Sequence, residues 1–363
     1  MALLRCCLLG MAVLGSLVPA WASAAADDHF VILLYHHVSD ATPASTSISP
    51  ERFAEHLDWL EDQDFRVWSL QQALQALADD KLPDRVVVIT FDDAYESVYH
   101  SAWPMLAKRE MPFSVFVNTD AINAGHRSYM GWAELRELAA AGVELGNHSA
   151  SHAHLTRAGV DEDDADWKRR VAEDIDRAHG RIEQQTGSAP KVFAWPYGED
   201  AAELYTLVSE RYRYALAQRS GAVGRHSESM ALPRFPLAQG WDSLERLALA
   251  VGARPLPAQA AETQPPRRKS AVSNPQELQL RLADQRGFSA ARIQCYAAMG
   301  DALPTRMLDP LGPPVLRIDP GGIGRPGRNK VNCTAPADDG SGDYYWYSFQ
   351  WLQPRADGSW PDN

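Results

Sequence analysis

Residues 86–93 read VVVITFDD, an apolar and β-rich run that ends in two carboxylates. The run lacks the alternation of apolar and polar residues that a half-exposed strand shows, so we expect a strand that is buried on both faces, as parallel strands are. Runs of the same character stand at residues 31–35 and 113–117, and a shorter one at residues 191–194. The sequence therefore predicts a sheet of buried strands, one of which ends in adjacent aspartates.

Stretches with helical spacing lie between these strands. Apolar residues recur at intervals of three and four in residues 51–61 and 132–141, and a longer helix is predicted over residues 164–186, ending at Gly187. Because strand and helix alternate from residue 27 to residue 252, we expect a parallel sheet or barrel.

A second polar motif closes another buried stretch about fifty residues after the first. It reads Asn147-His148-Ser149-Ala150-Ser151-His152. One aspartate and two histidines make a facial metal site, which leaves the second aspartate free to act as a base. In a β/α barrel the chemistry gathers where strands end. The two motifs together therefore predict a metal-dependent hydrolase.

Three motifs in this order resemble the successive motifs of NodB-type polysaccharide deacetylases, carbohydrate esterase family 4. They are residues 90–93 (TFDD), residues 148–152 (HSASH) and residues 193–198 (FAWPYG). Tyr35-His36 on the first strand is similar to a feature of the branch that includes the poly-N-acetylglucosamine deacetylases. The resemblance covers roughly residues 30–250.

The resemblance implies a distorted (β/α)7-type barrel, the NodB homology domain, that binds one divalent cation. It implies Asp93, His148 and His152 as metal ligands and Asp92 as the general base. Zinc is the first expectation, although such a site also suits cobalt, nickel or iron. Bound zinc lowers the pKa of its water to about 7 and polarises a carbonyl group.

The same resemblance nominates an oxyanion donor and a general acid. The donor is the backbone N–H of Tyr197, just after Pro196. A departing amine needs a proton, and the Leu-x-His motif that supplies it in much of the family is absent after the third motif. We therefore assign His36 as the acid, with His226 as the alternative. His37 should point elsewhere if the segment is a strand.

The third motif departs from the family pattern at one position. Many members have an arginine that holds the catalytic aspartate where this chain has Ala194. Arg234 is predicted to substitute for it, because an ion pair would keep Asp92 charged. Trp195 is either a wall against the sugar ring or the acetyl methyl, or a buried packing residue, and the sequence leaves both open.

The first residues have the pattern of an export signal. Arg5 precedes an apolar stretch, and small residues follow at positions 22–24. We expect a signal peptide over residues 1–24 and a secreted or periplasmic protein, with an uncleaved anchor as the alternative. No later segment approaches the length of a membrane span.

Signal cleavage would leave two cysteines, Cys295 and Cys333. An oxidising compartment favours a disulfide between them. The alternative is a pair of buried free cysteines.

The composition changes after the predicted barrel domain, residues 27–252. Residues 253–273 are rich in proline and are predicted to be a linker. Residues 274–363 are predicted to form a small, mainly β domain that begins with a helical stretch. Its alternating Tyr345, Tyr347, Phe349 and Trp351 are expected to form the inner face of that domain, with a glycan-binding surface as the alternative.

The whole chain has 363 residues and a formal net charge of −12. This charge argues against nucleic acid or an anionic membrane as the main partner. The function that we expect is hydrolysis of the acetamide groups of an N-acetylhexosamine polymer, poly-N-acetylglucosamine or peptidoglycan, by a metal-dependent polysaccharide N-deacetylase. The alternatives are an O-acetyl esterase acting on xylan and a catalytically inactive glycan-binding protein. The sequence does not indicate an oligomeric state.

Overall fold

The computed structural model describes residues 28–261, 278–283, 285–297, 300–308, 314–319 and 324–361. The predicted signal peptide, residues 1–24, lies outside the described residues, as does the greater part of the predicted linker. Within the described part of the chain, none of the helices has both the length and the apolar character needed to cross a membrane.

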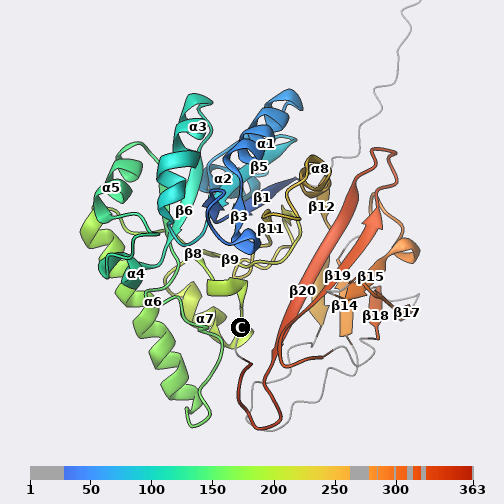
Figure 1. Cartoon of the computed structure of the whole chain (residues 1–363). Coiled ribbons are helices and arrows are strands. Elements are labelled where there is room, and N and C mark those ends of the chain that lie inside the picture. Colours follow the sequence, from blue (N-terminus) through green and yellow to red (C-terminus); the bar gives the residue numbers. More distant parts are fainter. Residues whose placement is uncertain are drawn as a thin grey trace, which may run out of the picture.

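A curled, mostly parallel sheet surrounded by helices forms the first two thirds of the chain (Figure 1). Its strands follow the order β10-β1-β5-β6-β7-β8-β9, with β4 against β5 and β11 against β1. The bounds are β1 His29–Tyr35, β4 Arg66–Val67, β5 Val86–Phe91, β6 Phe113–Val117, β7 Glu144–Asn147, β8 Val192–Ala194, β9 Tyr214–Leu216, β10 Val223–Gly224 and β11 Phe235–Pro236. Strand β10 runs antiparallel to β1, whereas the core pairings from β1 through β9 are parallel. The predicted α/β fold of the barrel type is confirmed.

Every residue of β5 and β6 is buried, as their uninterrupted apolar sequence predicts. The helices that cover the sheet and the short helical turns are α1 Pro50–Asp62, α2 Leu70–Ala78, η2 Val98–Ala102, α3 Trp103–Lys108, α4 Thr119–Asn123, α5 Trp132–Ala140, α6 Asp164–Thr186, η3 Pro196–Gly198, α7 Ala202–Ser209 and α8 Leu244–Val251. Helix α6 ends at Gly187, whose φ of 76° is left-handed, as predicted.

The segment after β10 closes the gap between β9 and β1. Its Leu232 N–H donates to the carbonyl of Ala215 on β9 (2.8 Å), and the N–H of Leu237 donates to the carbonyl of Leu34 on β1 (2.9 Å). Because this segment joins both sides of the curled sheet, it carries Arg234 to the edge where the parallel strands end.

Two β-sheets form the C-terminal domain, shown in orange and red in Figure 1. The first has the order β12-β20-β19-β15-β16 and the second β13-β14-β18-β17. The bounds are β12 Ala253–Pro255, β13 Ala258–Ala261, β14 Leu278–Leu282, β15 Gln294–Ala297, β16 Ala302–Leu303, β17 Thr305–Leu308, β18 Val315–Ile318, β19 Gly327–Pro336 and β20 Tyr344–Gln353, with the short turn η4 Ala290–Arg292 before β15.

Two sequence-based expectations for this part are wrong. Residues 253–255 and 258–261 are strands β12 and β13 and not linker, because their backbone groups pair with β20 and β14. Where a helical stretch is expected near the start of the domain, the first described residues, 278–282, form strand β14, whose alternating Leu278, Leu280 and Leu282 are buried. A period of two in the burial is the mark of a strand.

The aromatic residues of β20 divide between its two faces. Tyr345, Phe349 and Trp351 are buried in the core between the two sheets, and Tyr347 packs against it, so this stripe is the inner face. Trp346 faces the other way and packs edge-to-face on Phe235 of the barrel, with ring centroids 5.4 Å apart.

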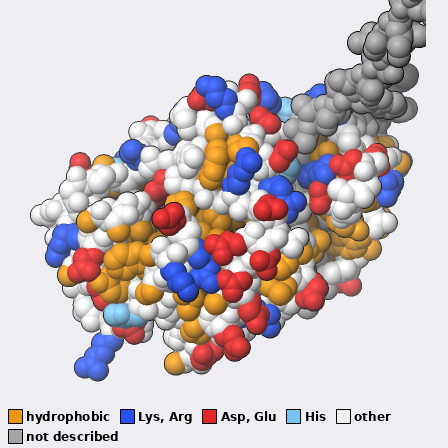
Figure 2. All heavy atoms as spheres, turned by 90° about the horizontal axis from the view of Figure 1, so that it is seen from above, with side chains coloured by type: hydrophobic (Ala, Val, Ile, Leu, Met, Phe, Trp, Pro, Cys, Tyr) orange, Lys and Arg blue, Asp and Glu red, His pale blue; other side chains and the backbone are white. Residues whose placement is uncertain are grey.

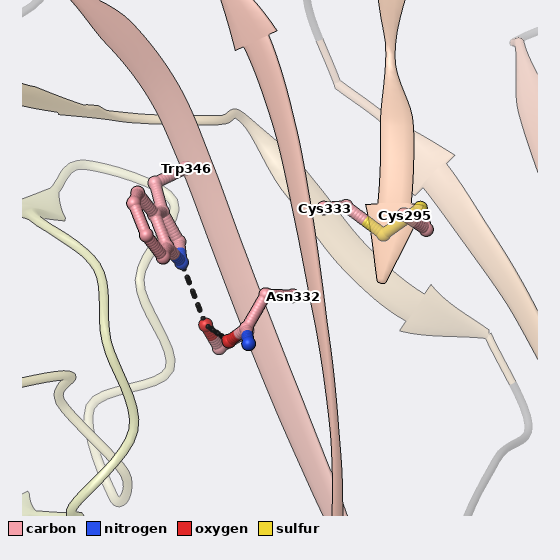
Figure 3. The surroundings of a disulfide bond; sticks show 5 residues. Cys295, Asn332, Cys333 and Trp346 are labelled. Carbon is pink, nitrogen blue, oxygen red and sulfur yellow. Dashed lines mark hydrogen bonds between the residues drawn. A yellow bond between two sulfur atoms is a disulfide. The ribbon is translucent and has the colours of Figure 1, made fainter. Parts of the chain in front are cut away.

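A disulfide joins Cys295 on β15 to Cys333 on β19, where the two residues lie directly opposite each other. Figure 3 shows it on one side of the sheet, with Trp346 and Asn332 on the side of the barrel loops. The Trp346 indole N–H and Asn332 meet through the hydroxyl of Ser348, at 2.9 and 2.6 Å. The predicted disulfide is therefore present in the structure.

Candidate active site

Asp92 and Asp93 directly follow β5, and both are buried. The Asp92 backbone N–H donates to the carbonyl of Tyr35 (3.0 Å), which extends the β1–β5 pairing to the first aspartate. Asp93 then turns out of the strand with a φ of 72°. A left-handed aspartate is uncommon and costs backbone energy, so its persistence here indicates a position fixed by the surrounding structure.

Asp93, His148 and His152 gather into one cluster, whose ligand atoms all lie within 4.8 Å of one another. Asp93 Oδ1 lies 3.0 Å from His152 Nε2 and 3.5 Å from His148 Nε2. That oxygen is buried and accepts no hydrogen bond of good geometry from the described residues. A buried, unsatisfied carboxylate oxygen facing two imidazole nitrogens is the donor set of a divalent cation site, so the residues present fit such an ion.

The neighbours of His148 fix its ring. Nδ1 lies 2.8 Å from the carbonyl oxygen of Ala194, which assigns the proton to Nδ1 and turns Nε2 toward the cluster. Burial lowers the pKa of His148 to about 4, against the opposing charge of Asp92. The ring is therefore neutral at pH 7, and neutral imidazole is the form that binds a metal.

The loop that carries both histidines is held by its own polar side chains. The Asn147 carboxamide oxygen accepts the N–H of Ser149 (2.7 Å), and the Ser149 hydroxyl accepts the N–H of His152 (3.0 Å). The buried Asp174 of α6 accepts backbone N–H groups from Ala150 and Ser151. These bonds hold Ser149 and His152 at φ values of 65° and 53°. The asparagine and the first serine of this motif therefore hold the loop in the conformation that carries both histidines.

Arg234 forms a two-point ion pair with Asp92. Nη1 lies 2.7 Å from Oδ1 and Nη2 lies 2.8 Å from Oδ2, and the arginine is entirely buried. Its Nε donates to the carbonyl of Ala217 (2.9 Å), which fixes the plane of the guanidinium. Burial alone would raise the pKa of Asp92, but Arg234 and His148 outweigh it and lower that pKa. The contact predicted in place of the missing family arginine is present in the structure.

His36 lies between β1 and β2 (His37–Val38), directly after Tyr35, whose carbonyl accepts the Asp92 N–H, and His37 is the first residue of β2. Burial raises the pKa values of both carboxylates and their neighbours lower them; His36 is one of these neighbours, after Arg234 and His148 at Asp92 and after His152 and His148 at Asp93. His37 does not point away, as we expected for the next residue of the same strand, because it belongs to β2, which pairs with Ser47–Ile48 outside the main sheet. It stacks on Tyr95 with ring centroids 3.5 Å apart. Burial and then His36 lower its pKa to about 4.

Tyr95 is a site residue that the sequence analysis missed. Burial and then Asp93 raise the pKa of its hydroxyl, which also interacts with Tyr129. In the sequence, only its position two residues after Asp93 could have indicated that Tyr95 lies at the site. Tyr95 therefore remains a neutral phenol that borders the cluster.

The third motif places Pro196 and Tyr197 beside the histidine loop. Tyr197 has a φ of 59°, and its ring stacks on His154 at 3.7 Å between centroids and lies 4.6 Å from His152. The left-handed backbone makes a sharp turn directly after β8. The role of the Tyr197 N–H as an oxyanion donor stays a prediction.

Trp195 is not a wall of the substrate site. Its side chain is wholly buried, its indole N–H donates to the carbonyl of Met230 (2.8 Å), and its ring packs edge-to-face on Phe193. A side chain with no exposed surface cannot contact a sugar. Its place among the substrate residues is therefore wrong, and the packing alternative holds.

His226, the alternative acid, lies at the wrong end of the barrel. It follows Gly224, which pairs with His29 at the start of β1, whereas the aspartates lie beyond the end of that strand. At about 3.3 Å per residue, the seven residues of β1 separate the two places by about 20 Å. Among the two nominated histidines, only His36 lies at the cluster.

A buried carboxylate supports the loop that follows the second histidine. Glu199 lies 2.9 Å from His154 Nδ1 and 2.7 Å from Arg157 Nη2. Burial would raise its pKa, but His154 and Arg157 lower it to about 2. His154 thus has a structural partner in a buried carboxylate.

Comparison with known proteins agrees with this geometry. Residues 79–215 match the family model described as polysaccharide deacetylase. The poly-β-1,6-N-acetyl-D-glucosamine N-deacetylase of Staphylococcus aureus is 24% identical over 221 residues, which cover 59% of this chain and 75% of that protein.

Two solved structures share the fold. IcaB from Ammonifex degensii is 26% identical, with a TM-score of 0.53 over 61% of this chain and 97% of that one. The BpsB deacetylase domain from Bordetella bronchiseptica is 26% identical, with a TM-score of 0.51 over 58% of this chain and 97% of that one. The matched part of this chain lies in the barrel, and residues 79–215 form a polysaccharide deacetylase domain of the NodB type, carbohydrate esterase family 4.

Proposed function

We propose that the protein is an exported, metal-dependent N-deacetylase that acts on a polymer of N-acetylhexosamine. The observation that carries the proposal is the cluster of Asp93, His148 and His152 next to the ion-paired Asp92. The named activity of the Staphylococcus relative favours poly-N-acetylglucosamine as the substrate, with peptidoglycan second. The sequence of residues 1–24 and the disulfide support export, because disulfides persist in oxidising compartments.

Asp93, His148 and His152 would hold the cation. When bound, a divalent ion of this kind supplies a Lewis acid, which polarises the acetyl carbonyl and makes water a nucleophile at neutral pH. The neutral state of His148 and the buried, unsatisfied Oδ1 of Asp93 support this assignment. Zinc is the first candidate, and cobalt, nickel and iron suit the same donors.

Asp92 accepts the proton of the attacking water. Its ion pair with Arg234 keeps the carboxylate charged, and the two-point geometry holds it in one orientation. As the C–O bond forms, negative charge develops on the former carbonyl oxygen, and the N–H of Tyr197 donates to it. The sharp turn at Tyr197 supports this role, since it places that residue against His152.

His36 donates a proton to the nitrogen of the leaving group. The C–N bond then breaks, the amine stays on the polymer and acetate departs. The proximity of His36 to both carboxylates supports this assignment, as does the distance of His226 from the cluster. An amide needs this proton far more than an ester does, since an alkoxide leaves more easily than an amine.

Acetate release tests the proposal directly. The purified protein with added Zn²⁺ or Co²⁺ should release acetate from N-acetylglucosamine oligomers, and the Asp92→Asn variant should not. Acetylated xylan in parallel reactions distinguishes the O-acetyl esterase. No release from either substrate by metal-loaded protein would count against the enzyme and favour the glycan-binding alternative.

A further inference from the structure

A groove separates the barrel from the barrel-facing side of the five-stranded sheet. Its volume is about 710 Å³, within the range of about 300–1,000 Å³ that is usual for ligand sites. Residues from β11 to the C-terminal part of α8, among them Phe235, Trp241 and Ala250, form one wall. The other wall consists of alternate residues of β19 and β20 with part of β15, such as Asn332, Trp346 and Tyr296. The C-terminal domain therefore supplies half of this groove.

One lining residue of the groove contacts the candidate active site. Arg328, on its sheet wall, donates to the backbone carbonyl of Tyr197, the residue nominated as the oxyanion donor. Lys330 Nζ donates to the carbonyl of Gln218 (2.6 Å) one step further along β19. Ser45, on the other rim, lies two residues before Ser47, which pairs with His37. The groove therefore lies next to the cluster, within reach of a polymer bound there.

Exposed aromatic side chains lie beside the cluster and along the groove. Among the described residues, three aromatic side chains are strongly exposed, namely Tyr197, Trp241 and Tyr344. Tyr197 borders the cluster, and the other two line the groove. Trp241 is 59% exposed, an unusual surface for so large an apolar ring. Rings with an apolar face and a polar edge suit the C–H faces and hydroxyls of a sugar.

The charge of the groove differs from that of the whole protein. The chain has a net charge of −12, and Figure 2 shows acidic and basic side chains interspersed over one face. The described residues that line the groove nevertheless include Arg246, Arg328 and Lys330 and no aspartate or glutamate. The Arg246 guanidinium lies 4.6 Å from the centre of the Trp241 ring. Glu199 and Asp200 act on Arg328 and Lys330 from outside the lining, and burial lowers the pKa of Lys330 to about 7, so the positive charge that a ligand would meet comes chiefly from Arg246. A ligand with ammonium groups would meet like charge there.

We propose that this groove binds the uncharged, still acetylated stretch of an N-acetylhexosamine polymer that flanks the sugar being deacetylated, and that it rejects stretches already converted to amines. Trp241 stacks on a sugar ring, and Arg246 donates hydrogen bonds to acetamide carbonyls. This inference rests on the proposed function and adds to it a preference for acetylated neighbours.

The first test compares chain lengths. We would measure kcat/KM for acetate release from the dimer and the hexamer of N-acetylglucosamine with the wild type and with Trp241→Ala. The ratio of hexamer to dimer should fall at least tenfold in the variant. Trp132→Ala is the matched control, since the Trp132 ring also lies under an arginine, Arg181, but outside the groove. An unchanged ratio in Trp241→Ala would overturn the inference.

The second test compares charges. Calorimetry on the Asp92→Asn variant, which prevents turnover, would give the affinity for the acetylated hexamer and for its fully deacetylated form at about pH 6. The acetylated form should bind at least tenfold more tightly, and adding Arg246→Gln should reduce that preference. Equal affinities in the Asp92→Asn protein would refute the charge selection. A wild type that releases no acetate from either length would instead refute the proposed function, while the calorimetry would still report on the groove.

Discussion

Arg234 places Nη1 and Nη2 at 2.7 and 2.8 Å from the two carboxylate oxygens of Asp92, although 142 positions separate the two residues. Both side chains are buried, so the pair is screened little by water or salt. The arginine comes from the segment that closes the barrel and not from the motif in which the family usually carries it.

Arg234→Gln should therefore raise the pKa of Asp92, because its opposite charge is lost. The acidic limb of the pH profile of kcat/KM should move to higher pH by at least about one unit. Loss of one partner of a buried pair should also lower the free energy of unfolding by about 3–5 kcal/mol, measured by urea titration. An acidic limb at its wild-type position would show that Arg234 does not control the base.

His152→Ala should weaken the binding of Zn²⁺ at least a hundredfold, since it removes one of three clustered ligands. The measurement is metal content and affinity after dialysis against a chelator, independent of activity. Asp92→Asn is the control, because Asp92 is predicted to be the base and not a ligand, and it should retain the metal. Equal metal loss in both variants would contradict this division of roles.

His36→Gln should separate amide from ester hydrolysis. We expect acetate release from N-acetylglucosamine oligomers to fall by about 10²–10⁴, the usual contribution of a general acid. Hydrolysis of 4-nitrophenyl acetate should fall much less, since its leaving group needs no proton. His226→Gln serves as the control at the far end of the barrel. The assignment fails if both substrates lose activity equally in the His36 variant.

Glu199 should make the protein sensitive to acid. Its pKa is lowered to about 2 by His154 and Arg157, from an ordinary value near 4.5. Its contribution to the free energy of unfolding is therefore complete above pH 4.5 and is lost as the pH falls toward 2, in total about 3 kcal/mol. Glu199→Gln should be less stable at pH 7 and show a flatter decline in this window. Parallel unfolding curves for the two proteins across the window would speak against this linkage.

Gly198→Ala should be far more damaging than Gly187→Ala. Both glycines have left-handed backbones, with φ values of 64° and 76°. A Cβ at position 198 would lie 2.1 Å from Cβ of Gln218, whereas nothing lies within 4 Å at position 187. The Gly187 variant should lose about 1–2 kcal/mol from backbone strain alone, and the Gly198 variant more than about 4 kcal/mol. Thermal unfolding would compare the two, and similar losses would exclude the steric argument.

The parts of the fold that the sequence predicts well are those in which local pattern and tertiary environment agree. Residues 86–91 form a strand buried on both faces, and helix α6 ends at its glycine. Motifs at the ends of neighbouring parallel strands meet because those ends share one edge of the sheet. Asp93, His148 and His152 are therefore neighbours in the structure.

The sequence-based predictions are wrong where contacts between residues distant in the sequence determine the structure. Trp195 follows a strand end like the site residues, but its side chain turns into a core formed with distant residues. Proline suggested a linker at residues 253–261, yet Ala253–Pro255 pairs with β20 at the edge of its sheet, where a missing N–H is tolerated. His37 stacks on Tyr95 because β1 ends at Tyr35 and His37 belongs to a separate short strand, and no local sequence feature indicates that break.

Strand β12 follows α8 of the barrel almost directly, and it is also an edge strand of the five-stranded sheet through its pairing with β20. The passage between the two halves is therefore hydrogen-bonded strand and not a hinge, and Lys330 and Gln350 tie the same sheet to barrel backbone at Gln218 and Gly198. We accordingly expect the groove between the barrel and the five-stranded sheet to keep a constant width. A long polymer would slide along this groove from one acetyl group to the next, without any movement of the two domains relative to each other.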